Sequence, residues 1–402
     1  MPEASPKSSP LLPIFLIVLV DVLGLTIILP LLPFYAQSYG ASATQVGLLV
    51  STYAFCQLIA GPILGKMSDH SGRKPLLIVS QIGTFIGFLV LASAHSLWLV
   101  FLSRVIDGIT AGNLSLAQAY IADVTEPKDR SKSFALIGIA FGIGFLIGPG
   151  ISGFLAQYGY AYPILTAAAL SFTSILCTTF LLPGTKPHTD GAPGPGGQRL
   201  GIFDWAAYLE YFRRPGLGRL LFQFLCFAVS FSLFISGFPL YAKGRYLWEG
   251  KPYGAREVGY ILAYAGFLGI ILQGGLMGPL VKWMGERKLV WTGFAASAVS
   301  YTVLGWTNTF GQLLGANTIG SYGSGVVRPA VTSLITQQVG RREQGVVLGL
   351  TQSLTSIAQI VAPVIGGALI DRGWLAAWAC ATGAAALAGF LISVRADLGT
   401  RL

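Results

Sequence analysis

Charged side chains are scarce in this chain. Only 10% of its 402 residues are Asp, Glu, Lys or Arg, whereas soluble globular domains contain about 25%. Hydrophobic residues make up 53% and the mean hydropathy is +0.67. The apolar runs exceed the roughly 20 residues with which a helix crosses a bilayer. These features exclude a soluble globular fold and predict a polytopic helical membrane protein.

Several patterns that mark other classes of protein are also missing. Alternating segments of about ten residues, typical of a transmembrane β-barrel, do not occur. The four cysteines lie in apolar segments without metal-ligand spacing, and the three histidines are scattered. The sequence holds no nucleotide-binding loop, so ATP does not drive the protein directly. We therefore expect neither an enzyme nor a bound metal or cofactor.

Apolar runs divide the chain into two similar halves, residues 1–183 and 217–402, joined by a linker at 184–216. The linker begins with a Pro- and Gly-rich stretch, and residues 202–213 have the pattern of a short amphipathic helix on the membrane surface. The sequence predicts an all-α membrane protein with twelve transmembrane helices in two six-helix bundles. The expected spans are 11–35, 44–66, 75–94, 97–123, 132–156, 162–183, 217–240, 256–281, 289–308, 311–338, 345–370 and 374–394.

Basic residues are unevenly divided between the two sides of this arrangement. Of 26 Lys and Arg residues, 19 lie on the side of the termini and linker, five on the opposite side and two within spans. Loops rich in Lys and Arg remain in the cytoplasm. We expect an integral plasma membrane protein (the inner membrane in a bacterium) with both termini cytoplasmic. The net charge of +10 then reflects topology and anionic lipid rather than binding of nucleic acid.

The two halves are related by an internal repeat. A shift of 213 residues places Gly65–Lys74 over Gly278–Arg287, and a shift of 214 places Gly148–Pro149 over Ala362–Pro363. Two parallel six-helix repeats with a long linker are typical of secondary transporters.

The loop between the second and third spans is rich in glycine and charge. It resembles the signature loop of the major facilitator superfamily of secondary transporters, through Gly65, Asp69, Gly72, Arg73 and Lys74. The resemblance covers nearly the whole chain and implies that this loop latches the two bundles when the transporter opens outward. Arg73 could reach Asp123 at the end of the fourth span. A solvated loop that only sets topology is the alternative.

In the second half this loop has lost its pattern. Lys282 stands in place of Asp69, and Glu286 in place of Arg73. We therefore expect an asymmetric latch, with the gating residues in the first half.

Two further segments are similar to the tetracycline-resistance-like drug:proton antiporters of that superfamily. Arg104-Val-Ile-Asp107-Gly108-Ile-Thr lies in the fourth span. The fifth span resembles the antiporter motif of the group, with Gly144, Gly148, Pro149 and Gly153. The resemblance implies rocking-bundle alternating access, with the proton as the coupling ion.

Four formal charges lie deep in the predicted spans: Asp21, Arg104, Asp107 and Arg328. A charge at the bilayer centre costs about 2.5–3.5 kcal/mol even on the lenient scale, so each requires a reason. Asp21 or Asp107 could take up and release a proton, with Arg104 close to Asp107 at i, i+3. A purely structural pair of Arg104 with Asp107 is the alternative, and the sequence does not decide which carboxylate titrates.

Polar residues recur on single faces of several apolar spans. Matched stripes in both halves favour a central site between the bundles, although hydrogen bonds between neighbouring helices would explain some of them. The candidate cavity residues are Gln57, Ser115, Gln118, Asn317, Ser324, Arg328, Gln352 and Gln359. Arg328 does not match the tetracycline exporters, and an anionic or zwitterionic substrate would account for it.

Six aromatic residues, Phe224 to Tyr241, are spaced three or four residues apart on one face of the seventh span. Three of them, Phe227, Phe231 and Phe234, are candidates for an aromatic wall around an apolar ligand. Contact with lipid or packing inside the bundle is the alternative.

Together these patterns predict proton-driven export of a small amphipathic compound. The rival function is a proton-linked uptake symporter for a metabolite or organic anion, which Arg328 would suit. A membrane enzyme would need a metal cluster or an activated nucleophile, and buried charges in matched cavities argue against a receptor that transports nothing. We expect a monomer surrounded by membrane lipid, with a small molecule as its substrate.

Overall fold

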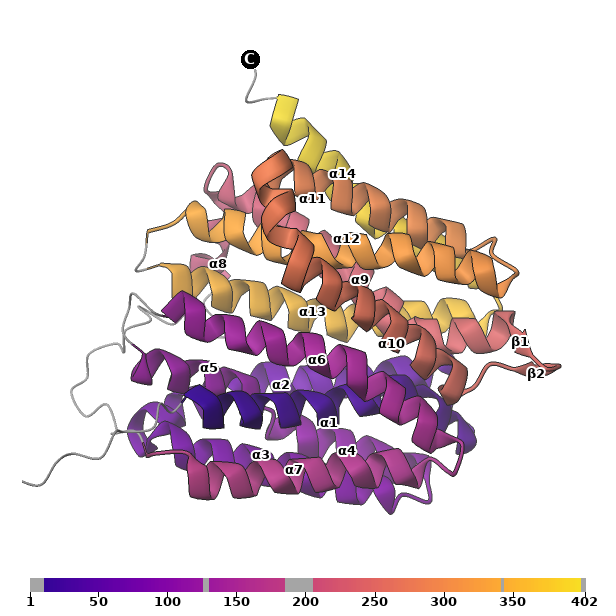
Figure 1. The fold of residues 1–402 in the computed structure, drawn as a ribbon, viewed down its shortest axis with the longest axis horizontal. Helices are drawn as coiled ribbons and strands as arrows, with labels where there is room; N and C mark the ends of the chain where they lie inside the picture. Colours follow the sequence, from indigo (N-terminus) through magenta and orange to yellow (C-terminus); the bar gives the residue numbers. More distant parts are fainter. Residues whose placement is uncertain (1–10, 126–129, 185–204, 341–342, 399–402) are drawn as a thin grey trace, which may run out of the picture.

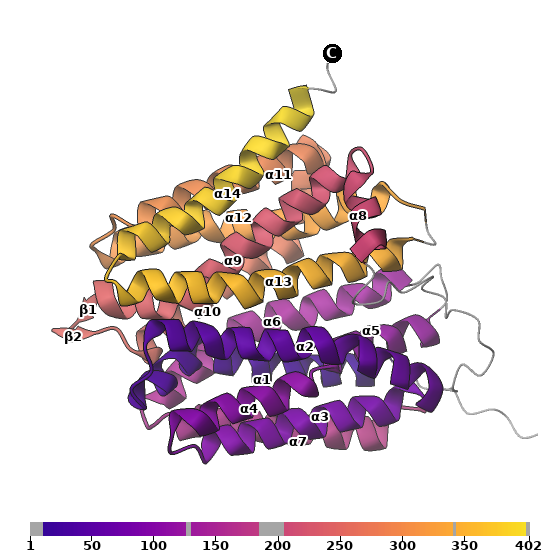
Figure 2. The same cartoon turned by 180° about the vertical axis from the view of Figure 1, so that it is seen from behind.

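Two helical bundles lie side by side with their helices along a common direction (Figures 1 and 2). The computed structural model describes residues 11–125, 130–184, 205–340 and 343–398. The linker residues 185–204 therefore lie outside the described chain. The first bundle contains α1 (Leu11–Ser38), α2 (Ala43–Ser71), α3 (Arg73–Ala92), α4 (Leu97–Ile109), α5 (Asn113–Val124), α6 (Arg130–Ala156) and α7 (Ala161–Leu181).

The second bundle contains α9 (Leu217–Arg245), α10 (Ala255–Ile271), the π-helical turn η1 (Leu272–Leu276), α11 (Met277–Leu304), α12 (Phe310–Gln337), α13 (Gln344–Asp371) and α14 (Leu375–Leu398). An antiparallel hairpin of β1 (Leu247–Trp248) and β2 (Lys251–Pro252) joins α9 to α10. The short helix α8 (Trp205–Arg213) forms the described part of the amphipathic helix expected at 202–213. The hairpin and α8 lie at opposite ends of the fold, called here the hairpin end and the α8 end (Figure 1).

The helices have the lengths that membrane crossings require. Ten stretches of the described chain are long and apolar enough to cross a membrane. One of them, Ala255–Leu304, has 50 residues and turns back at Gly285, so it forms two crossings. α12 has 28 residues and supplies a further crossing, although its polar residues lower its hydropathy. The architecture is therefore the predicted one, with twelve transmembrane helices in two bundles.

The two loops related by the 213-residue shift share one backbone conformation. Gly72 has φ 87° and ψ 157°, and Gly285 has φ 75° and ψ 159°. A side chain disfavours this positive-φ region, so glycine allows the sharp reversal between consecutive helices. The repeat in the sequence is thus a repeat in the backbone.

The fourth span differs from the single helix that the sequence predicts over 97–123. α4 ends at Ile109, and α5 begins at Asn113. The Ser80 hydroxyl on α3 donates to the Thr110 carbonyl and accepts from the Gly112 N–H at 2.9 Å. These bonds satisfy backbone groups that the break removes from the helical ladder, as a membrane interior requires.

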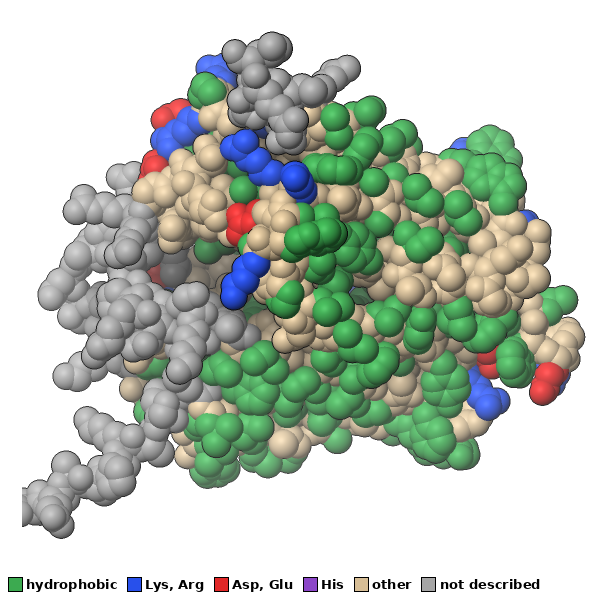
Figure 3. Space-filling view, turned by 45° about the horizontal axis from the view of Figure 1, so that its top comes forward, with side chains coloured by type: hydrophobic (Ala, Val, Ile, Leu, Met, Phe, Trp, Pro, Cys, Tyr) green, Lys and Arg blue, Asp and Glu red, His purple; other side chains and the backbone are tan. Residues whose placement is uncertain are grey.

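The apolar core is shared at one end and divided at the other. At the hairpin end one cluster joins residues of both bundles, among them Leu31 and Phe238. Toward the α8 end the first bundle has its own cluster around Tyr120, and the second has its own around Phe294. Apolar side chains also cover much of the face seen in Figure 3, while charged ones gather toward its ends. The bundles are therefore joined most firmly at the hairpin end.

Candidate functional site

Two carboxylates within the spans lie against α3. Asp21 on α1 is half-buried beside Gln81 on α3 and Ser174 on α7. One turn along α3, Thr84 lies beside the buried Asp107 on α4. Because Gln81 and Thr84 are i, i+3 neighbours on one helix face, α3 brings the two carboxylates that the sequence left as alternatives into one polar network.

Further contacts hold this network in place. Gln81 donates from Nε2 to Ser174 Oγ at 2.8 Å, and Ser171 donates to the Gln81 carbonyl at 3.4 Å. Gln81, Thr84 and Ser174 were not among the residues predicted from the sequence. The signal that could have found them is the pair of polar residues three positions apart in the apolar third span.

Arg104 and Asp107 form the predicted pair at i, i+3. Arg104 Nη1 lies 3.4 Å from Asp107 Oδ2, and the two residues are only 5% and 6% exposed. The remaining guanidinium nitrogen, Nη2, is buried without a hydrogen-bond partner among the described residues. Gly87 on α3 permits the close approach, since a Cβ there would lie 3.1 Å from that of Asp107. The pair is therefore packed against α3 inside the first bundle.

The charged loop at the α8 end is organised around Arg73. Its guanidinium lies 2.5 Å from Asp69 and 2.8 Å from Asp123, and it donates to Ser68 Oγ at 2.6 Å. Lys74 donates to the Thr179 carbonyl on α7 at 2.8 Å. Arg73 thus ties the end of α2 to the end of α5, the contact expected from the sequence. The latch between bundles stays a prediction.

In the second half a single carboxylate with uncharged partners takes the place of this ionic cluster. Glu286 accepts hydrogen bonds from Ser333 Oγ at 2.6 Å and from Gln337 Nε2 at 2.9 Å, both on α12. The residue after the positive-φ glycine therefore contacts the end of the same helix of the repeat in each half, α5 in the first and α12 in the second. The replacement of Arg73 by Glu286 changes the chemistry and keeps the contact.

The glycine-rich segment of α6 packs in two directions. A Cβ at Gly144 or Gly148 would collide with Val22 or Thr26 of α1, and Thr26 donates to the Gly144 carbonyl at 2.9 Å. Gly153 instead faces the second bundle, where a Cβ would lie 2.8 Å from the Arg256 carbonyl of α10. Pro149 takes part through its carbonyl, which faces Gly259 of α10. The motif thus packs α6 against its own bundle and against the other.

A second contact between bundles joins α2 to α13 at the hairpin end. The Ala43 N–H donates to Asp371 Oδ1 at 2.6 Å, and Ser51 Oγ donates to the Ile360 carbonyl at 2.5 Å. Gly47 faces the Pro363 carbonyl and leaves no room for a side chain. The two helices therefore touch backbone to backbone. Asp371 was not a predicted site residue, because its partner lies in the other half of the sequence.

The polar cavity candidates differ in their exposure. Asn317 is buried, while Gln57, Ser324 and Gln359 are half-buried, and Gln57 donates to the Tyr53 hydroxyl at 3.3 Å. Polar residues in the spans rarely face lipid, so exposed ones favour a water-filled space. The exposed candidates are Ser115 and Gln118 on α5, Arg328 on α12 and Gln352 on α13.

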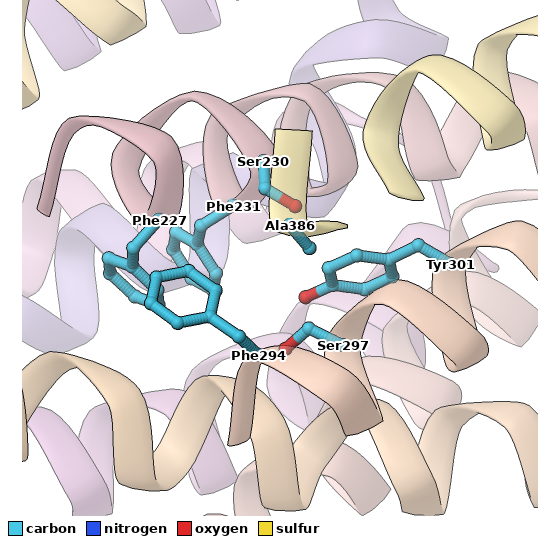
Figure 4. Close-up of a pocket in the computed structure, with 7 residues that line it drawn as sticks. All are labelled: Phe227, Ser230, Phe231, Phe294, Ser297, Tyr301 and Ala386. Carbon is cyan, nitrogen blue, oxygen red and sulfur yellow. The ribbon is translucent and has the colours of Figure 1, made fainter. Parts of the chain in front are cut away.

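The aromatic stripe on α9 points into the second bundle. Phe227 and Phe231 stack at 5.7 Å and line a pocket of about 190 Å³ together with Ser230, Phe294, Ser297, Tyr301 and Ala386 (Figure 4). Phe234 is 7% exposed and stacks on Tyr301 at 4.8 Å. Its position favours the packing alternative. The pocket has essentially no room for a water-sized sphere, so any ligand would require it to widen.

Comparison with known proteins identifies relatives along nearly the whole chain. The family model described as "Major Facilitator Superfamily" matches residues 14–286 and 268–398. The class B tetracycline resistance protein of Escherichia coli is 30% identical over 371 residues, which cover 89% of either chain. The quinolone resistance protein NorA of Staphylococcus aureus is 27% identical over 351 residues, 87% of either chain.

Solved structures share the architecture. The human organic anion transporter MFSD10 superposes with a TM-score of 0.74 at 23% identity, over 97% of this chain and 100% of that one. The nucleoside transporter NupG superposes with a TM-score of 0.76 at 13% identity, over 96% of this chain and 99% of that one. These relatives are membrane transporters of small molecules rather than enzymes, and this chain belongs to the major facilitator superfamily.

Proposed function

We propose that this transporter exports a small amphipathic compound in exchange for protons. The observation that carries the proposal is the polar face of α3, where Gln81 lies beside Asp21 and Thr84 lies beside Asp107. Carboxylates within a membrane span are costly and mark proton pathways in pumps and transporters. Arg104 carries a positive charge beside Asp107. Protonation of Asp107 would remove the negative charge that attracts this guanidinium.

Alternating access is the mechanism that fits the arrangement of the bundles. The shared core and the backbone contacts of α2 with α13 and of α6 with α10 lie toward the hairpin end. Separate cores toward the α8 end allow that end to part while the hairpin end stays closed. Rocking of the two bundles about the centre would then close the α8 end and open the hairpin end.

The membrane orientation follows from the basic loops. The reversals between α2 and α3 and within α11 lie at the α8 end (Figure 1). They carry Lys66, Arg73, Lys282 and Arg287, and Lys- and Arg-rich loops stay in the cytoplasm. The α8 end is then cytoplasmic, in a bacterial inner membrane, with the protein acting as a monomer among lipids. In this orientation the hairpin end faces the outside, and the contacts between the bundles close it.

A transport assay in a pump-deficient bacterial host tests the function. Expression should lower the accumulation of a cationic dye such as rhodamine 6G or an anionic dye such as fluorescein, and a protonophore should restore it. Uphill uptake that a protonophore abolishes would instead establish the rival function, a proton-linked symporter for a metabolite or organic anion. Accumulation that is insensitive to the protonophore would contradict both.

A further inference from the structure

Arg328 is a cation without a counterion inside the second bundle. Its side chain is exposed although it lies within the 28-residue helix α12. In the first bundle, Arg73 and Arg104 each have an aspartate within 4 Å. Arg328 has no hydrogen-bond or ion-pair partner for its guanidinium among the described residues. Such a charge is expensive in a membrane span unless water or a ligand reaches it.

Four acidic residues of the same bundle are engaged elsewhere. Glu257 accepts from the Gly254 N–H, and Glu286 accepts from α12. Glu343 holds Arg214 at 2.8 Å, and Asp371 holds the start of α2. α9 and α12 contain neither Asp nor Glu. The protein therefore offers no carboxylate to Arg328 from these described helices, and a bound molecule would have to supply the negative charge.

Arg328 ends a stripe of hydrogen-bond donors on α12. Asn317, Ser321, Ser324 and Arg328 follow at intervals of four, three and four residues, which places them on one helix face. Asn317 is 4% exposed and Ser321 is 7% exposed, yet Asn317 Nδ2 and Ser321 Oγ have no partner among the described residues. Leaving a buried donor unpaired costs free energy. Asn317 Nδ2, Ser321 Oγ and the Arg328 guanidinium therefore have no acceptor among the described residues.

We propose that Arg328 recognises an acidic group, such as a carboxylate, on the transported compound. This inference rests on the proposed transport function and deepens it by naming an organic anion as the substrate class. A guanidinium binds a carboxylate through two parallel hydrogen bonds. Asn317 lies 11 residues from Arg328, about 16 Å along the helix axis. Ser321 and Asn317 therefore carry the next unpaired donors on this helix face, toward the hairpin end.

Three ligands with one aromatic body test the charge preference: 2-naphthoate, 2-naphthylmethylammonium and 2-naphthalenemethanol. Binding to the purified full chain in detergent is measured by the shift in its thermal unfolding midpoint. We expect 2-naphthoate to bind and Arg328→Gln to weaken its binding about tenfold or more. Arg328→Lys should lie between the wild type and Arg328→Gln, because it keeps the charge and loses the two parallel hydrogen bonds of the guanidinium. Arg372→Gln, which removes an exposed arginine at the hairpin end, serves as the control and should bind like the wild type.

The outcomes separate this inference from the transport function. Equal or tighter binding of the ammonium compound, an unchanged affinity of Arg328→Gln for 2-naphthoate, or no response to millimolar 2-naphthoate would each overturn the anion preference. Proton movement is followed in the same preparations, reconstituted into liposomes that contain a pH-sensitive dye. Binding that depends on Arg328 without any proton flux would support the anion site and refute proton coupling.

Discussion

Asp371 and Thr44 join the two bundles across the hairpin end. Thr44 donates to Asp371 Oδ2 from its backbone N–H at 2.8 Å and from its hydroxyl at 2.5 Å. Thr44 lies in the first turn of α2, where unpaired N–H groups and the helix dipole attract a negative charge. Asp371 is the last residue of α13 in the other bundle. A carboxylate of one half thus caps a helix of the other, and opening this end must break the contact.

Asp371→Asn should loosen the hairpin end. Hydrogen bonds to a charged group are worth about 1.5–3 kcal/mol, so losing the charge should shift the equilibrium toward opening by about tenfold. Gln37 and Lys243, hydrogen-bonded across the same end at 2.7 Å, offer a reporter. Both reporter residues are changed to cysteine in a chain whose four native cysteines have been replaced. Oxidative cross-linking of this pair should then be slower with Asp371→Asn than without it.

Glu249→Gln is the matched control for Asp371→Asn. Glu249 lies in the β-hairpin turn at the same end and is exposed, so its loss should leave cross-linking unchanged. If Asp371→Asn cross-links as fast as its parent, the carboxylate does not hold this end closed.

Gly259→Val should obstruct the contact between α10 and α6. A Cβ at Gly259 would lie 2.5 Å from the Pro149 carbonyl and 2.8 Å from Gly153 Cα. Overpacking of this kind costs about 1–3 kcal/mol, so the thermal unfolding midpoint should fall and transport should drop at least tenfold. Gly269→Val on the same helix is the control, because no atom lies within 4 Å of a Cβ there. Equal behaviour of the two variants would rule out a tight interface at Gly259.

Asp21→Asn and Asp107→Asn should separate proton coupling from substrate movement. An amide cannot take up a proton at neutral pH, so efflux driven by a pH gradient should fall at least tenfold in the variant of the coupling residue. Exchange of substrate at equal concentrations across the membrane should persist. Wild-type efflux should increase as the outside becomes more acidic than the inside, whereas the variant should not respond. Full gradient-driven efflux by both variants would eliminate the α3 network as the proton carrier.

Ser80→Ala should destabilise the break in the fourth span. The substitution removes the hydroxyl that bonds both the Gly112 N–H and the Thr110 carbonyl and leaves only their bond to each other at 2.7 Å, at a cost of about 0.5–1.5 kcal/mol per lost hydrogen bond. Ser93→Ala, which removes an exposed hydroxyl at the end of α3, should change the stability by less than about 0.5 kcal/mol. Thermal unfolding in detergent measures both. No difference between the two variants would show that the break does not depend on Ser80.

The sequence by itself determined the number and order of the spans, because a membrane forces long apolar runs into helices. It also determined the repeat. Gly72 and Gly285 occupy matched positions, and positive φ at both follows from local geometry that glycine alone adopts easily. The charges within the spans, Asp21, Arg104, Asp107 and Arg328, stood out because each is costly in an apolar run.

Only the tertiary structure decided how these residues combine. Asp21 and Asp107 lie against the same polar face of a third helix, beside Gln81 and Thr84, and the Gly112 N–H at the break is bonded by Ser80 of α3. Asp371 meets Thr44, 327 residues away in the chain. Hydrophobic periodicity indicates which face of a helix is buried but not which other helix covers that face. The pairing of helices, and with it the site, arises from packing between segments far apart in the sequence.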